Sequence, residues 1–272
     1  MEQLNWLTAM QAAQGIRDGL FSSEDLVGAC IKQIQVREPE VQAWAYFDAD
    51  HALAQARRAD EWRAAGKQLG PLHGVPVGVK DIIDTNDMPT EDGTPLHAGR
   101  SPWRDAKVVE LLRIAGAVIM GKTVTTELAT YSPGKTRNPH NPEHTPGGSS
   151  SGSAAAVAAG MVPLALGTQT NGSLLRPAAY CGVFGFKPTR GLVSRQGILH
   201  QSESLDQVGG FARSIEDVAL LGEVLSAYDP DEPGMLPRSC TPLLRVCTEN
   251  PLLPPSLALV KTPWWSHLDS DT

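Results

Sequence analysis

The chain has 272 residues, a length that fits one large domain or two small ones, and its composition is that of an ordinary soluble globular protein. Its formal net charge is -7 and it has no basic stripe, so we expect no direct binding to nucleic acid. It shows no signal peptide and no apolar run of about 18 residues, which predicts a cytoplasmic protein with no membrane partner.

The first part of the chain predicts a helical flank. Apolar residues recur at helical spacing over residues 8–18, 23–36 and 50–65. The second of these helices opens with the letters SSED, a start that resembles a capping box. No side chain in this part suggests chemistry, so we assign residues 1–68 a structural role.

Strands and helices alternate after the flank. Residues 75–79 and 117–120 are short apolar runs that predict strands, and residues 105–115 between them predict a helix. The alternation continues through residue 166. This pattern indicates an α/β fold, with a sheet covered by helices on both faces.

The last part of the chain is different in character. Residues 214–227 predict one more helix with a serine at its start. Residues 230–272 are rich in proline and contain one plausible strand, at residues 257–261. The final residues, 269–272, resemble the beginning of a helix that follows a strand.

Two serine-bearing, glycine-rich turns lie close together between residues 146 and 182. An alanine-rich helix at residues 153–159 and an apolar strand at residues 161–166 separate the two turns, and a helix at residues 174–180 follows the second one. Glycine allows a backbone to turn sharply and to approach another group closely. Backbone N–H groups at the start of this last helix would be free to face a developing negative charge; they belong to Thr170, Asn171, Gly172 and Ser173.

The sequence of these two turns and the segments around them closely resembles the sequence motifs of the amidase signature family of serine amidohydrolases. The matching segments are GGSSSGSAAA, GTQTNGS, RPAAYCG and GFKPTRG, together with GVPVGVKD earlier and SLDQVG later in the chain. The resemblance covers about residues 7–229. It implies an amidase-signature-like mixed β-sheet core at residues 69–229, in a single partial amidase domain over residues 1–272 that lacks the C-terminal part of longer members.

The resemblance also implies the site residues. It assigns catalytic roles to Lys80, Ser149 and Ser173, with a cis peptide bond at Ser149. The N–H groups of residues 170–173 would form the oxyanion hole, and Ser150 and Ser151 would support the network. The family hydrolyses amides through a serine acyl-enzyme, so we expect a small carboxamide as the substrate and no cofactor or metal.

The implied chemistry is physically coherent. A serine hydroxyl is a weak nucleophile and needs a base. Lys80 can be that base only when it is neutral, which requires burial to lower its pKa. Ser149 would pass the proton from Ser173 to Lys80, a triad without histidine.

Two functional alternatives stay open, and so does the oligomeric state. The same residues resemble the glutaminase subunit of a tRNA-dependent amidotransferase, which needs partner subunits. A homodimer is also possible, because dimers are common in the family. The family's members are usually much longer, so the chain could instead be an inactive truncated remnant or a binding protein.

Three shorter motifs suggest other chemistry, but their context argues against it. Residues 116–123 fit the phosphate-loop pattern G-x4-G-K-[ST], yet the variable positions form an apolar strand. Residues 148–152 fit G-x-S-x-G with Ser150 as the nucleophile, but three prolines precede them where a strand is required. His140 and His144 have the spacing of metal ligands on a helix, and Pro142 between them favours a solvated loop.

Three positions depart from the family pattern. Asn171 replaces a frequent glycine and must adopt the same turn, which asparagine tolerates. Gln169 stands where many members have aspartate, which removes a negative charge near the second turn. Arg176 lies three residues after Ser173, whereas members that read GGSIR place arginine two residues after the serine.

Overall fold

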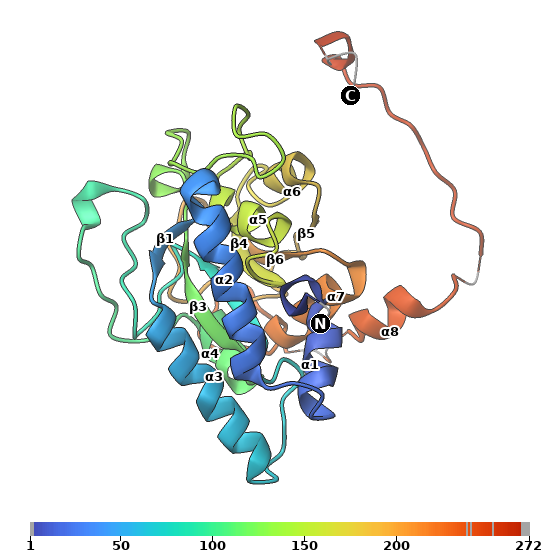
Figure 1. Ribbon diagram of the computed structural model, residues 1–272. Coiled ribbons are helices and arrows are strands. Elements are labelled where there is room, and N and C mark those ends of the chain that lie inside the picture. The colour runs from blue at the N-terminus through green and yellow to red at the C-terminus, as the bar shows by residue number, and fades with distance from the viewer. Residues whose placement is uncertain (1–2, 238, 240, 252, 268–272) are drawn as a thin grey trace.

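A six-stranded mixed sheet forms the centre of the protein (Figure 1). The computed structural model describes residues 3–237, 239, 241–251 and 253–267. The strands lie in the order β1-β3-β2-β4-β6-β5. Their bounds are β1 Trp44–Phe47, β2 Pro76–Lys80, β3 Val118–Thr123, β4 Leu164–Gln169, β5 Phe184–Phe186 and β6 Gln207–Ala212. Strand β2 runs parallel to β3 and β4, and the remaining pairs are antiparallel.

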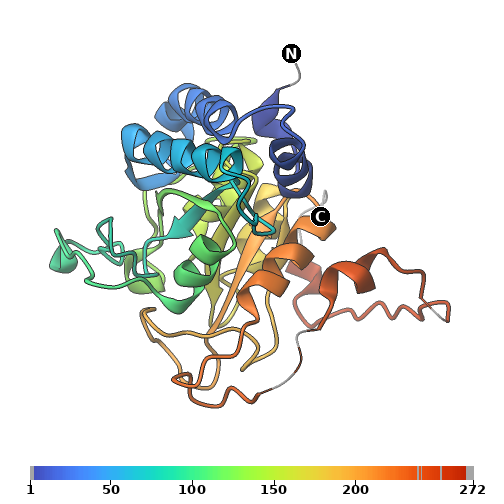
Figure 2. The ribbon, with the colours of Figure 1, turned by 90° about the horizontal axis from the view of Figure 1, so that it is seen from below.

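Eight α-helices surround the sheet in the described part of the chain. Their bounds are α1 Ala9–Arg17, α2 Ser23–Val41, α3 Ala49–Ala64, α4 Lys107–Ile114, α5 Ser151–Ala158, α6 Leu175–Cys181, α7 Ile215–Leu225 and α8 Leu243–Thr248. Short 3-10 turns occur at η1 Leu4–Trp6, η2 Pro95–His97, η3 Glu127–Ala129 and η4 Trp265–His267. Figure 2 shows the N-terminal helices, in blue, gathered at one side of the molecule.

Helices cover both faces of the sheet, as the sequence predicts. Successive residues of a strand point to opposite faces. On β6, Phe211 packs beside Gly167 of β4, where the hydroxyl of Ser150 at the start of α5 also lies. The neighbouring Gly210 faces Leu221 of α7 instead. Helices α5 and α7 therefore lie on opposite faces, and the expected mixed α/β architecture is confirmed.

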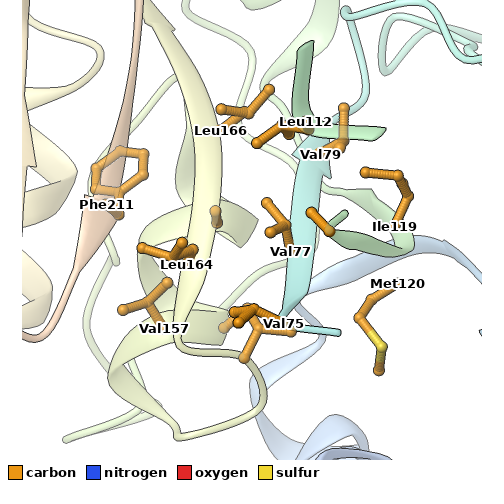
Figure 3. Packing of buried hydrophobic residues seen from close by; sticks show 14 of the residues in the cluster. Val75, Val77, Val79, Leu112, Ile119, Met120, Val157, Leu164, Leu166 and Phe211 are labelled. Carbon is orange, nitrogen blue, oxygen red and sulfur yellow. The ribbon is translucent and has the colours of Figure 1, made fainter. Parts of the chain in front are cut away.

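Strands β2 and β3 are buried along their whole length, and β4 is buried except at the half-buried Thr168. Val77 and Val79 of β2 lie opposite Leu164 and Leu166 of β4, and Ile119 of β3 completes this layer (Figure 3). Because these strands are parallel, their carboxyl ends meet at one edge of the sheet, which is where α/β folds usually bind ligands. Strand β2 therefore presents its last residue, a lysine, beside the end of β4.

The second helix is longer than the sequence predicts. The apolar pattern predicts an end at residue 36, but α2 continues to Val41 and contains Pro39. Proline in a helix removes one backbone hydrogen bond. Here Val41 is fully buried in the core, so packing of this last turn outweighs that loss. The capping box expected at its start is present at Ser22 and Asp25.

The strand expected at residues 257–261 is absent, and the prediction is wrong. These residues have no regular structure, and Leu257 and Leu259 are 94% and 79% exposed. A β-strand needs a neighbouring strand for its backbone hydrogen bonds, and none adjoins this segment in the described chain. Figure 1 shows the segment, in red, extending away from the helices and the sheet. The helix start expected at residues 269–272 lies outside the described residues.

Candidate active site

Lys80 lies at the carboxyl end of β2 and is fully buried. Its Nζ donates a 2.8 Å hydrogen bond to Ser149 Oγ and another of 2.8 Å to Thr168 Oγ1 near the end of β4. The structure thus brings together two of the expected catalytic residues, which are 69 positions apart in the sequence. The hydroxyl of Thr168 is a further contact; Thr168 belongs to the GTQTNGS segment, but the sequence analysis assigned it no role.

Burial changes the acid–base behaviour of Lys80. Removal from water disfavours the charged form and lowers the pKa of Lys80 to about 7, while the negative charge of Asp206 acts in the opposite direction. A lysine with this pKa is neutral in a large fraction of molecules near pH 7. It can therefore accept a proton, which an ordinary exposed lysine cannot do efficiently at this pH.

Ser149 belongs to the first glycine-rich turn and is almost completely buried. The peptide bond between Gly148 and Ser149 is cis, as the resemblance implies. The carbonyl oxygen of Gly148 accepts a 3.0 Å hydrogen bond from Arg176 Nε. Arg176, whose spacing from Ser173 departs from the family pattern, thus connects helix α6 to the turn that carries Ser149.

Ser150 and Ser151 anchor the same turn to the sheet. The hydroxyl of Ser150 accepts a bond from the Thr168 N–H and donates to the Thr168 carbonyl, both at 3.2 Å. Ser151 Oγ donates to the carbonyl oxygen of Val124 at 3.3 Å. Ser150 is fully buried, and an irregular segment rather than a strand precedes it. The context required for a G-x-S-x-G nucleophile is therefore missing, as expected.

Ser173 precedes Leu174, the N-cap of α6, and borders a cavity of about 440 Å³. The walls of this cavity are formed by three segments of the chain. They contribute Leu128, Ala129, Thr130, Tyr131, Thr170, Asn171, Ser173, Arg176, Leu199, His200 and Gln201. Within the described residues, no hydrogen bond joins the Ser173 hydroxyl to Ser149 or Lys80, so the structure brings Ser149 and Lys80 together and places Ser173 at the cavity wall.

The turn before Ser173 keeps its backbone donors free. None of the N–H groups of residues 170–173 has a hydrogen bond to an acceptor in the described chain. The next two N–H groups, of Leu174 and Leu175, are both taken by Gln169 Oε1, at 2.9 and 3.0 Å. Gln169, which replaces the more frequent aspartate, therefore caps the start of α6. The N–H groups of residues 170–173 therefore have no acceptor within the described chain.

The competing motifs have the structures that their context predicts. The phosphate-loop pattern coincides with strand β3, and Lys122 Nζ is buried and donates to the carbonyl of Ile83 at 2.6 Å and to Thr90 Oγ1 at 2.5 Å. His140 and His144 lie in an exposed irregular loop, where the His140 ring contacts the carbonyl of Cys181.

A family model described as Amidase matches residues 25–271 of this chain. The chain belongs to the amidase family. The resemblance found in the sequence motifs is thereby confirmed. Among curated relatives of this amidase-family chain, a glutamyl-tRNA(Gln) amidotransferase subunit of Chloroflexus aurantiacus is 44% identical over 236 residues, which are 85% of this chain and 48% of that protein. Its counterpart in Acidothermus cellulolyticus, which carries the same name, is 46% identical over 236 residues, 85% of this chain and 47% of that protein.

Solved structures of family members show the same fold. The native peptide amidase of Stenotrophomonas maltophilia superimposes with a TM-score of 0.84 at 37% identity, covering 88% of this chain and 52% of that one. A structure described as a vestigial protein complex, related to the origins of an s-triazine catabolic enzyme, gives a TM-score of 0.83 at 36% identity, covering 88% and 54%. The chain thus spans about half the length of the relatives it matches. In the part of the chain that the structure describes, every helix is too short or too polar to cross a membrane.

Proposed function

We propose that this protein is an amidase that hydrolyses a small carboxamide to a carboxylic acid and ammonia or an amine. Membership of the amidase family supports the reaction class. The observation that carries the proposal is the 2.8 Å contact between the buried Lys80 Nζ and Ser149 Oγ. A buried lysine with a pKa of about 7, connected to a serine hydroxyl, is what a triad without histidine requires.

The mechanism begins with neutral Lys80. Ser173 Oγ attacks the amide carbonyl carbon, its proton passes to Ser149, and the proton of Ser149 passes to Lys80. The negative charge on the carbonyl oxygen is stabilised by the free N–H groups of residues 170–173. The proton returns to the leaving nitrogen, the C–N bond breaks, and ammonia or an amine departs. Water, deprotonated through the same relay, then hydrolyses the acyl-enzyme and releases the acid.

A fluorophosphonate probe tests this proposal directly. Such probes phosphonylate an activated serine, so the intact mass of the 272-residue chain should increase by one probe adduct, located on Ser173. The Ser173→Ala and Lys80→Ala variants should both remain unlabelled, since the first lacks the nucleophile and the second lacks the base. Ser150→Ala serves as a control, because the proposal gives Ser150 only a supporting role and its variant should keep the adduct on Ser173.

Two results would contradict the proposal. Labelling of Ser150 with Ser173 untouched would favour a different nucleophile. No labelling of a chain that circular dichroism shows to be folded would favour an inactive remnant or a binding protein.

The second candidate function is the glutaminase subunit of a tRNA-dependent amidotransferase. The curated relatives at 44% and 46% identity are named as amidotransferase subunits, which favours it. In this case the chain would release ammonia from glutamine and would require partner subunits. Ammonia release from glutamine but not from other small amides, together with co-purification of partner subunits, would favour this candidate over a free-standing amidase.

A further inference from the structure

A carboxylate on a neighbouring loop is bound to the turn that precedes Ser173. Asp206 Oδ1 lies 2.5 Å from the hydroxyl of Thr170 and accepts its hydrogen bond. The other oxygen, Oδ2, accepts the N–H groups of Gln201 and Ser202 at 2.7 and 2.8 Å. Both oxygens of this carboxylate are thus used, one for the turn and one for its own loop. Asp206 lies in the SLDQVG segment, and the sequence alone suggested no role for it.

Gln201 extends this network to the third wall of the cavity. Its Oε1 lies 3.0 Å from the Thr170 hydroxyl, and its Nε2 donates a 2.6 Å hydrogen bond to the carbonyl oxygen of Leu128. Leu128 and Ala129 have left-handed backbones, with φ of 48° and 55°, which non-glycine residues adopt only when their surroundings enforce it. Asp206, Thr170 and Gln201 therefore connect all three segments around Ser173.

The charge of Asp206 also acts on Lys80. It raises the pKa of Lys80, against the larger lowering effect of burial. The other acidic groups near this edge of the sheet, Asp81, Asp84 and Asp92, act on the second buried lysine, Lys122. A small pocket lined by Thr168 and Asp206 is also lined by two basic side chains. One is the exposed His200, and the other is Arg195, which forms an ion pair with Glu232 at 2.6 Å.

We infer that Asp206 is a positioning residue of this site, which holds the turn of residues 170–173 through Thr170 and stabilises the protonated Lys80 that the proton relay produces. This inference rests on the proposed function. The turn carries both the nucleophile and the four free N–H groups, so its exact placement determines how well the oxyanion is bound. The proton that leaves Ser173 ends on Lys80, and a nearby negative charge favours that charged product.

Two substitutions separate these roles. Asp206→Asn has almost the same shape, removes the negative charge and weakens the bond to Thr170. Thr170→Val removes the hydroxyl but leaves the Asp206 charge in place. Glu203→Gln is a matched control, because it neutralises an exposed carboxylate on the same loop, three positions away.

The first experiment measures the pKa of Lys80 itself and needs no catalysis. The 13Cε chemical shift of Lys80, assigned by its loss in Lys80→Met, is followed against pH in the labelled 272-residue chain. Asp206→Asn should lower the pKa of Lys80 by roughly half a unit to one unit, while Thr170→Val and Glu203→Gln should change it little. An unchanged pKa in Asp206→Asn would overturn the electrostatic part of the inference.

The second experiment measures the rate of fluorophosphonate labelling at Ser173. Asp206→Asn and Thr170→Val should each lower this rate by about tenfold or more, because both release the turn, and Glu203→Gln should match the unsubstituted chain. Labelling of both variants at the unsubstituted rate would overturn the positioning role. An unsubstituted chain that takes no label would instead contradict the proposed function, and the Lys80 titration would still decide the inference. If Asp206→Asn does not fold, Thr170→Val alone decides the positioning role.

Discussion

Lys80 Nζ and Ser149 Oγ lie 2.8 Å apart, although one residue ends a central strand and the other lies in a cis turn before a helix. The contact joins two segments that are 69 positions apart in the sequence, so only the tertiary fold brings them together. It involves a lysine whose protonation state can change near neutral pH. Both the activity and the stability of the protein should therefore depend on this contact and on the network around it.

The rate of Ser173 labelling should depend on pH with an apparent pKa near the value of about 7 for Lys80. Lys80 can accept a proton only in its neutral form, which is lost as the pH falls below that pKa. The rate should therefore be constant at high pH and fall about tenfold for each pH unit on the acid side. Labelling rates measured from about pH 5 to about pH 9 check this, and a flat profile would exclude Lys80 as the base.

Lys80→Met should inactivate the protein and make it more stable. The folded pKa of Lys80 is lowered to about 7 from 10.5, so between these values the unfolded chain binds more protons and its charged lysine is better hydrated. Removing the buried amine should therefore raise the free energy of unfolding at pH 7 by about 1 to 2 kcal/mol. Lys80 would then be a residue that activity requires although it lowers the stability of the fold. Urea unfolding of both proteins measures this difference.

The pH dependence of that difference is a further check. Stability of the unsubstituted chain should rise as the pH increases from about 7 toward 10.5, because folding must remove the proton from Lys80 and the free-energy cost of this deprotonation falls to zero as the pH approaches 10.5. The difference in free energy of unfolding between Lys80→Met and the unsubstituted chain should shrink over the same range. A constant difference across it would contradict the lowered pKa of Lys80.

Lys122→Met should have the opposite effect on stability. Lys122 is as deeply buried as Lys80, but its Nζ lies 3.8 Å from Asp81 Oδ1 and donates to the carbonyl of Ile83. Its loss leaves a buried carboxylate without a counter-charge, which should cost about 3 kcal/mol of unfolding free energy. The double variant with Asp81→Asn should recover part of this loss, and the same urea titration tests both.

Gln169→Leu should loosen the start of α6. The two N–H groups of Leu174 and Leu175 would lose their shared acceptor, which should cost about 1 to 2 kcal/mol and slow the labelling of the adjacent Ser173. Gln169→Glu is the matched control, since its carboxylate can accept the same two bonds and a negative charge is favourable at a helix start. If Gln169→Leu had the same free energy of unfolding and the same Ser173 labelling rate as the unsubstituted chain, the cap would be unimportant.

Strand β6 illustrates why part of the fold could not be predicted from the sequence. Its letters QVGGFA contain two adjacent glycines, which disfavour a strand. In the folded chain a side chain at Gly209 would collide with the carbonyl of Phe186, and one at Gly210 with Leu221. The glycines are therefore required by neighbours from other elements. The wrongly predicted strand at residues 257–261 has the converse cause, because its local composition favours a strand but no strand of the described residues lies beside it.

The amino-acid sequence alone was enough to predict the family and the alternation of strands and helices, and to nominate Lys80, Ser149 and Ser173 as candidate site residues. Local patterns and ordered motifs are sufficient for those conclusions, because each of them involves residues that are close together in the sequence. The folded chain was needed to establish that Lys80 is fully buried, that it meets Ser149 and Thr168, and that Asp206 accepts a hydrogen bond from Thr170 in the turn before Ser173. Burial and electrostatic fields depend on residues far apart in the chain, and folding must bring these residues to one edge of the sheet before a lysine can become a base.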